Sequence, residues 1–175
     1  AQAYETAHIP GAVYAHLDRD LSGAKTGTNG RHPLPEPEAF RATLGRLGIS
    51  RARQVVAYDQ DSGMYASRLW WLLRWMGHDS VAVLDGGFTA WTADGRPTSS
   101  GVETRPAATF TGEPHSEMLT TVEALPAFVA SPGARLVDAR APERFRGDIE
   151  PLDPVAGHIP GALNHFFQWN LAGGR

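Results

Sequence analysis

Two groups of side chains in this 175-residue sequence have the types and spacing that chemistry requires. Asp59 and Asp61 follow a short apolar run, and carboxylates in such a loop could attack a substrate or bind Mg²⁺. Arg140 and Arg144 lie four positions apart, and their planar guanidinium groups suit a carboxylate or a sulfonate. The chain contains no cysteine, which excludes disulfides, thiolate metal sites and thiol catalysis by this chain alone.

An internal repeat organises the chain around these residues. The segment His-Ile-Pro-Gly-Ala occupies residues 8–12 and again residues 158–162, and a looser similarity continues from Val13 and Leu163 onwards. In each copy the proline fixes one φ angle and disfavours helix at the preceding isoleucine, while the glycine permits a sharp turn. The sequence therefore predicts a duplicated unit with an offset of 150 positions.

Hydrophobic periodicity predicts alternating helices and strands between the two copies. Helices are expected around residues 40–47, 69–76 and 88–91, and buried strands at residues 54–58 and 81–84. Pro37 and Gly48 mark the start and the end of the first of these helices. Such alternation is typical of an α/β fold with a parallel sheet, which binds ligands at the loops that follow its strands.

A segment rich in proline, glycine and serine separates the two halves. Residues 96–121 lack sustained periodicity, which favours an interdomain linker over a long surface loop within one domain. We therefore expect a first domain at residues 1–114, a linker at about 97–119, and the start of a second domain at 115–175.

The second half carries signals for one helix and one strand. Thr120 and Glu123 have the spacing of a capping box, ahead of a helix that Pro126 should kink. Residues 135–138 predict a strand that enters the second repeat. An alternative is that this strand completes the sheet of the first repeat.

Composition and charge exclude several kinds of partner. The net charge is -3 and the 16 Lys and Arg residues are scattered, so neither a nucleic-acid surface nor a basic membrane surface is expected. No apolar run approaches the roughly 18 residues of a membrane span, and the cytoplasm is the expected location. The seven histidines lack metal-ligand spacing and no glycine-rich nucleotide loop is present, so we expect neither a metal nor another cofactor.

The ordered motifs together resemble the rhodanese superfamily, in particular its two-domain sulfurtransferases for thiosulfate and 3-mercaptopyruvate. The resemblance covers nearly the whole chain. It rests on the two His-Ile-Pro-Gly-Ala segments, Tyr58-Asp59, residues 65–71, residues 84–88 with Trp91, residues 136–140 and residues 144–147. It implies an α/β fold with a parallel sheet and helices on both faces in each of two repeats. Both repeats would be incomplete, the first without its entering strand and the second without its catalytic loop, so we expect a piece of a longer polypeptide.

The resemblance also implies a reaction, namely transfer of sulfane sulfur from thiosulfate or 3-mercaptopyruvate to cyanide or a thiol through a cysteine persulfide. It assigns the cysteine to the second repeat, in polypeptide beyond Arg175, by analogy with the first copy. Asp59 occupies the corresponding position of the first repeat. Because a carboxylate cannot hold sulfane sulfur, this chain alone should be inactive.

Arg144 and Arg140 are the substrate-binding candidates. The resemblance implies that Arg144 contacts the anionic donor, whereas Arg140 is expected to organise the end of its strand. Either arginine could instead form structural ion pairs with neighbours such as Asp138 or Glu143. Met64, Tyr65 and Phe167 resemble apolar residues that wall the cleft between the repeats, although ordinary packing is an equally open role.

Two other functions stay open at this point. A non-catalytic rhodanese-like module would bind a partner or a small anion and would lack the cysteine permanently. The segment Asp59-Gln60-Asp61-Ser62 also resembles the nucleophile loop of haloacid-dehalogenase-like phosphatases, which use Mg²⁺. Those enzymes need a lysine downstream of the loop, and the only lysine here is Lys25, upstream of it.

Overall fold

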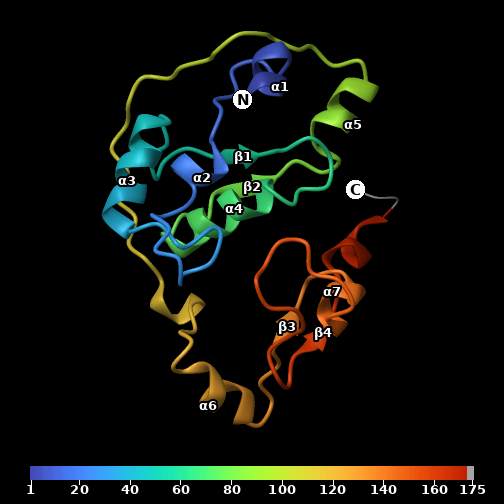
Figure 1. The fold of residues 1–175 in the computed structure, drawn as a ribbon. Coiled ribbons are helices and arrows are strands. Elements are labelled where there is room, and N and C mark those ends of the chain that lie inside the picture. The colour runs from blue at the N-terminus through green and yellow to red at the C-terminus, as the bar shows by residue number, and fades with distance from the viewer. Residues whose placement is uncertain (173–175) are drawn as a thin grey trace. The chain divides into compact units, whose positions relative to one another are not determined.

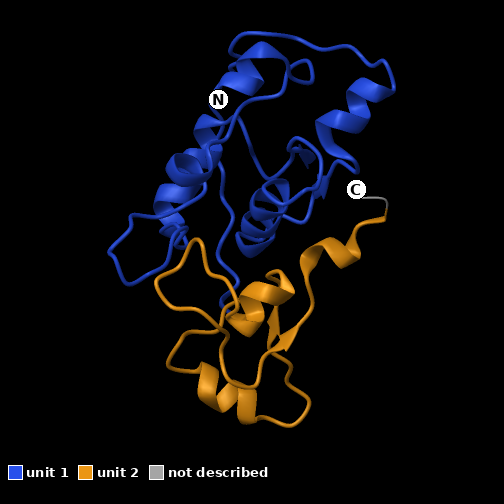
Figure 2. Cartoon of the chain, turned by 45° about the vertical axis from the view of Figure 1, so that its right-hand side comes forward, with its two compact units in different colours: residues 1–116, 175 blue, residues 117–174 orange. Residues whose placement is uncertain are grey.

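The computed structural model describes residues 1–172. Its chain divides after Ser116 into two compact units, coloured separately in Figure 2. We call residues 1–116 unit 1 and the part from Glu117 onwards unit 2.

Unit 1 contains a pair of parallel strands surrounded by helices (Figure 1). The strands β1 (Val55–Ala57) and β2 (Val81–Val83) pair with Val55 opposite Val81. The helices are α1 (Gln2–Thr6), α2 (Leu17–Asp20), α3 (Pro37–Arg46), α4 (Ala66–Trp75) and α5 (Gly87–Ala93). A 3-10 helix (Ser116–Met118) follows at the division between the units.

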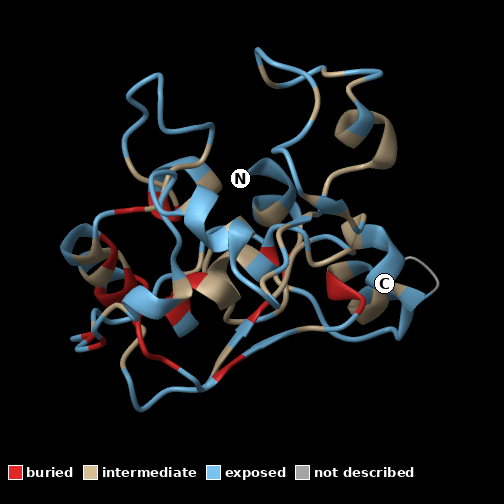
Figure 3. Cartoon of the chain, turned by 90° about the horizontal axis from the view of Figure 1, so that it is seen from below, coloured by how far each residue is buried: buried red, intermediate tan, exposed pale blue. Residues whose placement is uncertain are grey.

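The three helices predicted in this region are confirmed as α3, α4 and α5. The apolar stripes of α3 and α4 form the core of unit 1, because Phe40, Leu44 and Leu72 are all at most 1% exposed (buried residues are red in Figure 3). Pro37 lies in the first turn of α3, where a missing N–H costs nothing, and Gly48 has a φ of 75° just beyond its end.

The strands are where predicted, but the expectation that they are fully buried is wrong. Val56 is 55% exposed and Val83 is 36% exposed. Within the described residues β1 pairs with β2 alone, so its other edge lacks a neighbouring strand. Because α4 packs against both strands, the exposed side chains of Val56 and Val83 lie away from α4.

Unit 2 repeats the parallel pairing on a smaller scale. Its elements are α6 (Leu125–Ala130), β3 (Val137–Asp138), α7 (Pro142–Arg146), β4 (Leu163–Asn164) and a 3-10 helix (Phe167–Asn170). β3 pairs with β4 in a separate two-stranded sheet, so the alternative in which this strand completes the sheet of the first repeat is wrong. No residue between 117 and 172 is buried.

The predicted capping box of the second half is wrong. α6 begins later, with Ala124 as its N-cap residue and Pro126 in its first turn, where proline starts a helix without kinking it. Thr121, rather than Thr120, accepts a hydrogen bond from the N–H of Ala124 at 3.3 Å. Val122, which the pattern assigned to the helix, lies outside it and is 75% exposed.

The alternation of helices with parallel strands in both units confirms the α/β fold class. No helix within residues 1–172 is long and apolar enough to cross a membrane.

Candidate functional site

Asp59 begins the loop that joins β1 to α4, and main-chain donors surround its carboxylate. Oδ1 accepts a hydrogen bond from the N–H of Gly63 at 2.9 Å. Oδ2 accepts hydrogen bonds from the N–H groups of Tyr65 at 2.7 Å and Ala66 at 3.1 Å. We call these three N–H groups the amide nest. Because two of them belong to the start of α4, the partial positive charge of the helix end also favours an anion there.

Two glycines give the loop its shape. Gly63 has a φ of 72°, a left-handed conformation that ordinary side chains rarely adopt. Gly87, at the start of α5, comes so close that a Cβ there would lie 2.7 Å from the carbonyl oxygen of Asp59. That carbonyl accepts a hydrogen bond from the N–H of Phe88 at 2.9 Å. This bond joins the segment after β2 to the loop after β1.

The amide nest can hold one anionic group, and Asp59 fills it. A thiolate or a persulfide at the same position would meet the same donors, which lower the pKa of a thiol. This arrangement argues against the phosphatase alternative, because both carboxylate oxygens of Asp59 accept hydrogen bonds from main-chain N–H groups. Lys25, the only lysine, forms an ion pair with Asp18 at 3.1 Å.

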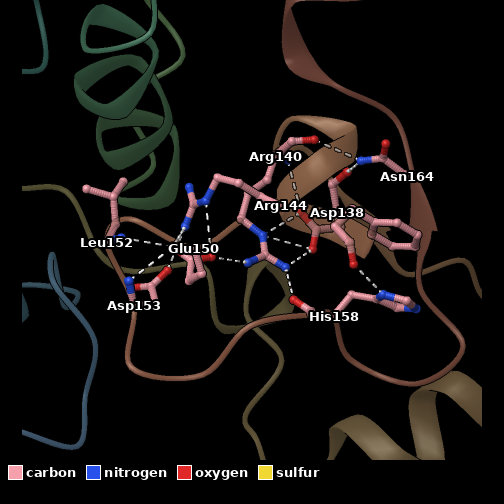
Figure 4. Close-up of polar contacts among 10 residues, drawn as sticks. Asp138, Arg140, Arg144, Glu150, Leu152, Asp153, His158 and Asn164 are labelled. Atoms are coloured by element: carbon pink, nitrogen blue, oxygen red, sulfur yellow. Dashed lines mark hydrogen bonds and ion pairs between the residues drawn. The ribbon is translucent and has the colours of Figure 1, made fainter. Parts of the chain in front are cut away.

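Arg140 lies just after β3, and its guanidinium group donates hydrogen bonds to several residues (Figure 4). Its Nε and Nη2 donate to the carboxylate of Asp138 at 3.0 and 2.6 Å. Nη2 also donates to the carbonyl oxygen of Gly157 at 2.6 Å, and Nη1 donates to Glu150 at 3.3 Å. Arg140 therefore joins the end of β3 to the loop that precedes the second repeat segment.

Arg144 projects from α7 towards the same loop (Figure 4). Its Nε and Nη2 donate to the two carboxylate oxygens of Glu150 at 3.1 and 2.6 Å, and Nη2 also donates to Asp153 at 2.9 Å. Arg140 thus has the partner that the sequence suggested, Asp138, whereas Arg144 pairs with Glu150 and Asp153 and not with Glu143.

Glu150 links the two arginines, and sequence reasoning missed it. Its side chain is 5% exposed and also accepts hydrogen bonds from the N–H groups of Leu152 and Asp153 at 3.0 and 3.1 Å. Hydrogen bonds from Arg144, with those two N–H groups, lower the pKa of Glu150 to about 2 against the opposing effect of desolvation.

The histidines of the two repeat segments make equivalent contacts, which show where unit 2 has extra residues. In each copy the histidine stacks on an aromatic ring, His8 on Tyr4 with centroids 4.1 Å apart and His158 on Phe145 with centroids 3.7 Å apart. The Nδ1 atom of each histidine lies within hydrogen-bond distance of the carbonyl oxygen of its aromatic partner, at 2.8 and 2.6 Å. These pairs are 4 positions apart in unit 1 and 13 in unit 2. The extra residues of unit 2 include Glu150.

The three predicted cleft residues lie in different units. Met64 and Tyr65 are 47% and 55% exposed just before α4 in unit 1. Phe167 of unit 2 packs edge-to-face on Phe166, with ring centroids 5.1 Å apart. Their role in a cleft between the repeats stays a prediction.

Comparison with known proteins identifies the family. Residues 1–94 match the Rhodanese-like domain. The chain is 46% identical over 173 residues to a probable 3-mercaptopyruvate sulfurtransferase of Pseudomonas aeruginosa, covering 98% of this chain and 61% of that protein. It is 41% identical over 165 residues to a putative thiosulfate sulfurtransferase of Mycobacterium tuberculosis, covering 93% of this chain and 57% of that protein.

A solved structure gives the same result. The crystal structure of a 3-mercaptopyruvate sulfotransferase from Escherichia coli superposes with a TM-score of 0.81 at 32% identity, covering 93% of this chain and 60% of that one. The chain thus spans about three fifths of the length of these relatives. Its parallel strands, its repeated motifs and these similarities show that the chain belongs to the rhodanese family.

Proposed function

We propose that this chain works as part of a sulfurtransferase that moves sulfane sulfur from thiosulfate or 3-mercaptopyruvate to cyanide or a thiol. The filled amide nest carries the proposal, because Asp59 places an anion where main-chain donors would stabilise a persulfide. The names of the relatives, which include donors of both kinds, support the class of reaction.

The nucleophile of the proposed reaction is a cysteine outside this chain, which has none. Its thiolate attacks the outer sulfur of thiosulfate, the sulfur–sulfur bond of the donor breaks, and sulfite leaves with the bonding electron pair. Cyanide then attacks the outer sulfur of the persulfide, so thiocyanate leaves and the thiolate is restored. Asp59 has no part in these steps, because an oxygen acid cannot carry sulfane sulfur.

The two arginines have different proposed roles. Arg144 would contact the anionic donor, and Arg140 would hold the end of β3 in place. The contacts of Arg140 with Asp138 and with the carbonyl of Gly157 support the positioning role. Because Glu150 and Asp153 already pair with Arg144, donor binding would have to compete with these carboxylates or add to them.

The proposed organisation is that of two rhodanese-like domains, at residues 1–114 and 115–175, of which the first is non-catalytic. The division of the chain into units after Ser116 supports it. Met64, Tyr65 and Phe167 would line the cleft between these domains. The proposed location is the cytoplasm, where a catalytic thiol and a thiol acceptor stay reduced.

The test compares this chain with the complete natural polypeptide that contains it. Incubated with thiosulfate and cyanide, the complete polypeptide should form thiocyanate, and the 175-residue chain should form none above buffer. Replacing the nucleophilic cysteine by serine should abolish the activity. A complete polypeptide without any cysteine would overturn the proposal and favour a non-catalytic binding module.

A further inference from the structure

Unit 1 contains a loop whose base is anchored and whose tip is open to water. The N–H of Gly23 donates a hydrogen bond to the carbonyl of Pro33 at 3.0 Å, which closes the base. Nη2 of Arg68 donates to the same carbonyl at 3.1 Å and to the carbonyl of His32 at 3.2 Å. Residues 24–31, which we call the loop tip, are all exposed.

The side chain of Asn29 holds the loop tip together. Its Oδ1 accepts a hydrogen bond from the N–H of Thr26 at 2.9 Å, and its Nδ2 donates one to the carbonyl of Ala24 at 2.9 Å. An asparagine amide can make both bonds because it carries an acceptor and a donor on one group. The conformation of the loop tip therefore depends on an intact amide at Asn29.

The residue after Asn29 leaves its own main-chain nitrogen accessible. Gly30 has a φ of 80°, and a Cβ at this position would meet no atom within 4 Å. Glycine turns easily about its main-chain bonds and has no side chain to shield its nitrogen. The nitrogen of Gly30 can therefore reach Cγ of Asn29, and a bond between these two atoms closes a succinimide ring.

The two other asparagines of the chain lack this neighbour. Asn164 precedes His165 and Asn170 precedes Leu171, so a bulky side chain hinders the approach of the following nitrogen in both cases. Asn170 is exposed, as Asn29 is. Exposure therefore does not distinguish the asparagines, whereas the following glycine does.

We propose that Asn29 is a site of spontaneous deamidation and that the reaction releases the loop tip. Hydroxide removes the proton from the main-chain nitrogen of Gly30, and this nitrogen attacks Cγ of Asn29. The bond from Cγ to Nδ2 breaks, and Nδ2 leaves as ammonia after it takes a proton from water. Water then opens the succinimide at either of its carbonyl groups, which gives aspartate or isoaspartate.

The product lacks a donor that the loop tip uses. An ionised carboxyl group at Asn29 cannot donate to the carbonyl of Ala24, and its negative charge is repelled by that oxygen. The hydrogen bonds of Gly23 and Arg68 at the base do not involve Asn29, so they remain. The change should therefore stay within the loop tip. The inference is independent of the proposed sulfur transfer.

The experiment incubates the full chain in a warm, mildly alkaline buffer and digests samples with trypsin. Cleavage after Lys25 and Arg31 gives a peptide of residues 26–31, in which the proposed site is the only asparagine. The mass of this peptide should rise by about 1 Da as an amide becomes a carboxyl group. The rate should be at least about tenfold higher than at Asn164 and Asn170.

Three variants separate the reaction from its consequence. Gly30→Ala should slow the reaction by at least about tenfold, because a side chain hinders the attacking nitrogen. Asn29→Gln, whose longer side chain would have to close a larger and less favoured ring, should also keep its amide. Asn29→Asp carries the carboxyl group from the start. In this variant the Thr26 amide should exchange about fivefold faster, as expected for one lost hydrogen bond, and the Gly23 amide should not change.

Two outcomes would overturn the deamidation site, namely equal rates at the three asparagines and an unchanged rate in both Gly30→Ala and Asn29→Gln. Equal exchange of the Thr26 amide in Asn29→Asp and in the unmodified chain would overturn the release of the loop tip. Because thiocyanate formation is not measured, none of these outcomes bears on the proposed function.

Discussion

The carboxylate of Asp59 accepts a 2.7 Å hydrogen bond from the main-chain N–H of Tyr65, at the start of α4. With Gly63 and Ala66 this contact fills the amide nest from within unit 1. Asp59 therefore has a structural task, which is to satisfy three main-chain donors at the start of α4.

Replacing Asp59 by asparagine should destabilise unit 1 by about 1–2 kcal/mol, because a charged acceptor of three N–H groups becomes a neutral amide. Urea unfolding measures the change. Asp61→Asn in the same loop is the matched control, since Asp61 is exposed and its carboxylate accepts a hydrogen bond from the N–H of the neighbouring Ser62. Equal losses for the two variants would contradict the role of the nest.

Replacing Asp59 by cysteine should convert the nest into a sulfur-accepting site. Its donors should lower the pKa of the new thiol, and incubation with thiosulfate should add one sulfur atom, seen by intact mass and removed by cyanide. Ser62→Cys puts a thiol in the same loop away from the nest and should gain less sulfur. Equal sulfur gain at both positions would show that the nest does not stabilise a persulfide.

Glu150→Gln should loosen unit 2, because Arg140 and Arg144 lose the carboxylate that joins them. The amides of Leu163 and His165, which close the β3–β4 pair, should exchange at least about tenfold faster. Glu143→Gln is the control, since the carboxylate of Glu143 is not part of this network. An unchanged exchange rate in Glu150→Gln would mean that Asp138 and Asp153 hold the arginines without it.

Acid should weaken unit 2 in a defined range of pH. The pKa of Glu150 is lowered from 4.5 to about 2, and the pKa of Asp138 is lowered by its hydrogen bonds with Arg140. A carboxyl group with a lowered pKa stabilises the folded state above its unfolded pKa, and this contribution disappears as pH falls towards the folded value. The protection of the β3–β4 amides against hydrogen exchange should stay constant from pH 7 to about 5 and should decrease below about 4.5. In Glu150→Gln the decline should be smaller.

Leu72→Ala should cost about 2–5 kcal/mol of stability, because Leu72 is fully buried in the core of unit 1. Val122→Ala, at a side chain that is 75% exposed in unit 2, should change it by less than about 0.5 kcal/mol. Thermal unfolding of the two variants measures the difference. A large effect at Val122 would show that this side chain is covered in solution.

Local signals were sufficient to predict the helices of unit 1. Phe40 and Leu44 mark the buried face of α3, and both are at most 1% exposed. The exposure of Val56 could not be predicted, since an apolar run does not reveal whether a neighbouring strand is present. The start of α6 was misplaced because Thr120 and Glu123 match a capping box by spacing alone, while the chain turns into helix only after Ala124.

The candidate site was predictable in part. Family motifs placed Asp59 in the loop after β1, but its three partners are main-chain N–H groups, which have no signature in the side-chain sequence. Asp138 and Glu143 were the ion-pair partners considered for the two arginines, and Arg140 pairs with Asp138. Glu150 was missed because its partners Arg144 and Arg140 lie 6 and 10 positions away in the sequence. Helical periodicity relates only residues three or four positions apart.

The uneven burial of the two units has a consequence for how the chain would be degraded. No residue between 117 and 172 is buried, whereas unit 1 has a core around α3 and α4. Segments with few buried contacts open at low cost, and a protease cuts the open form. Cleavage should therefore begin beyond Ser116 and leave a more durable product that retains Asp59 and the strands β1 and β2.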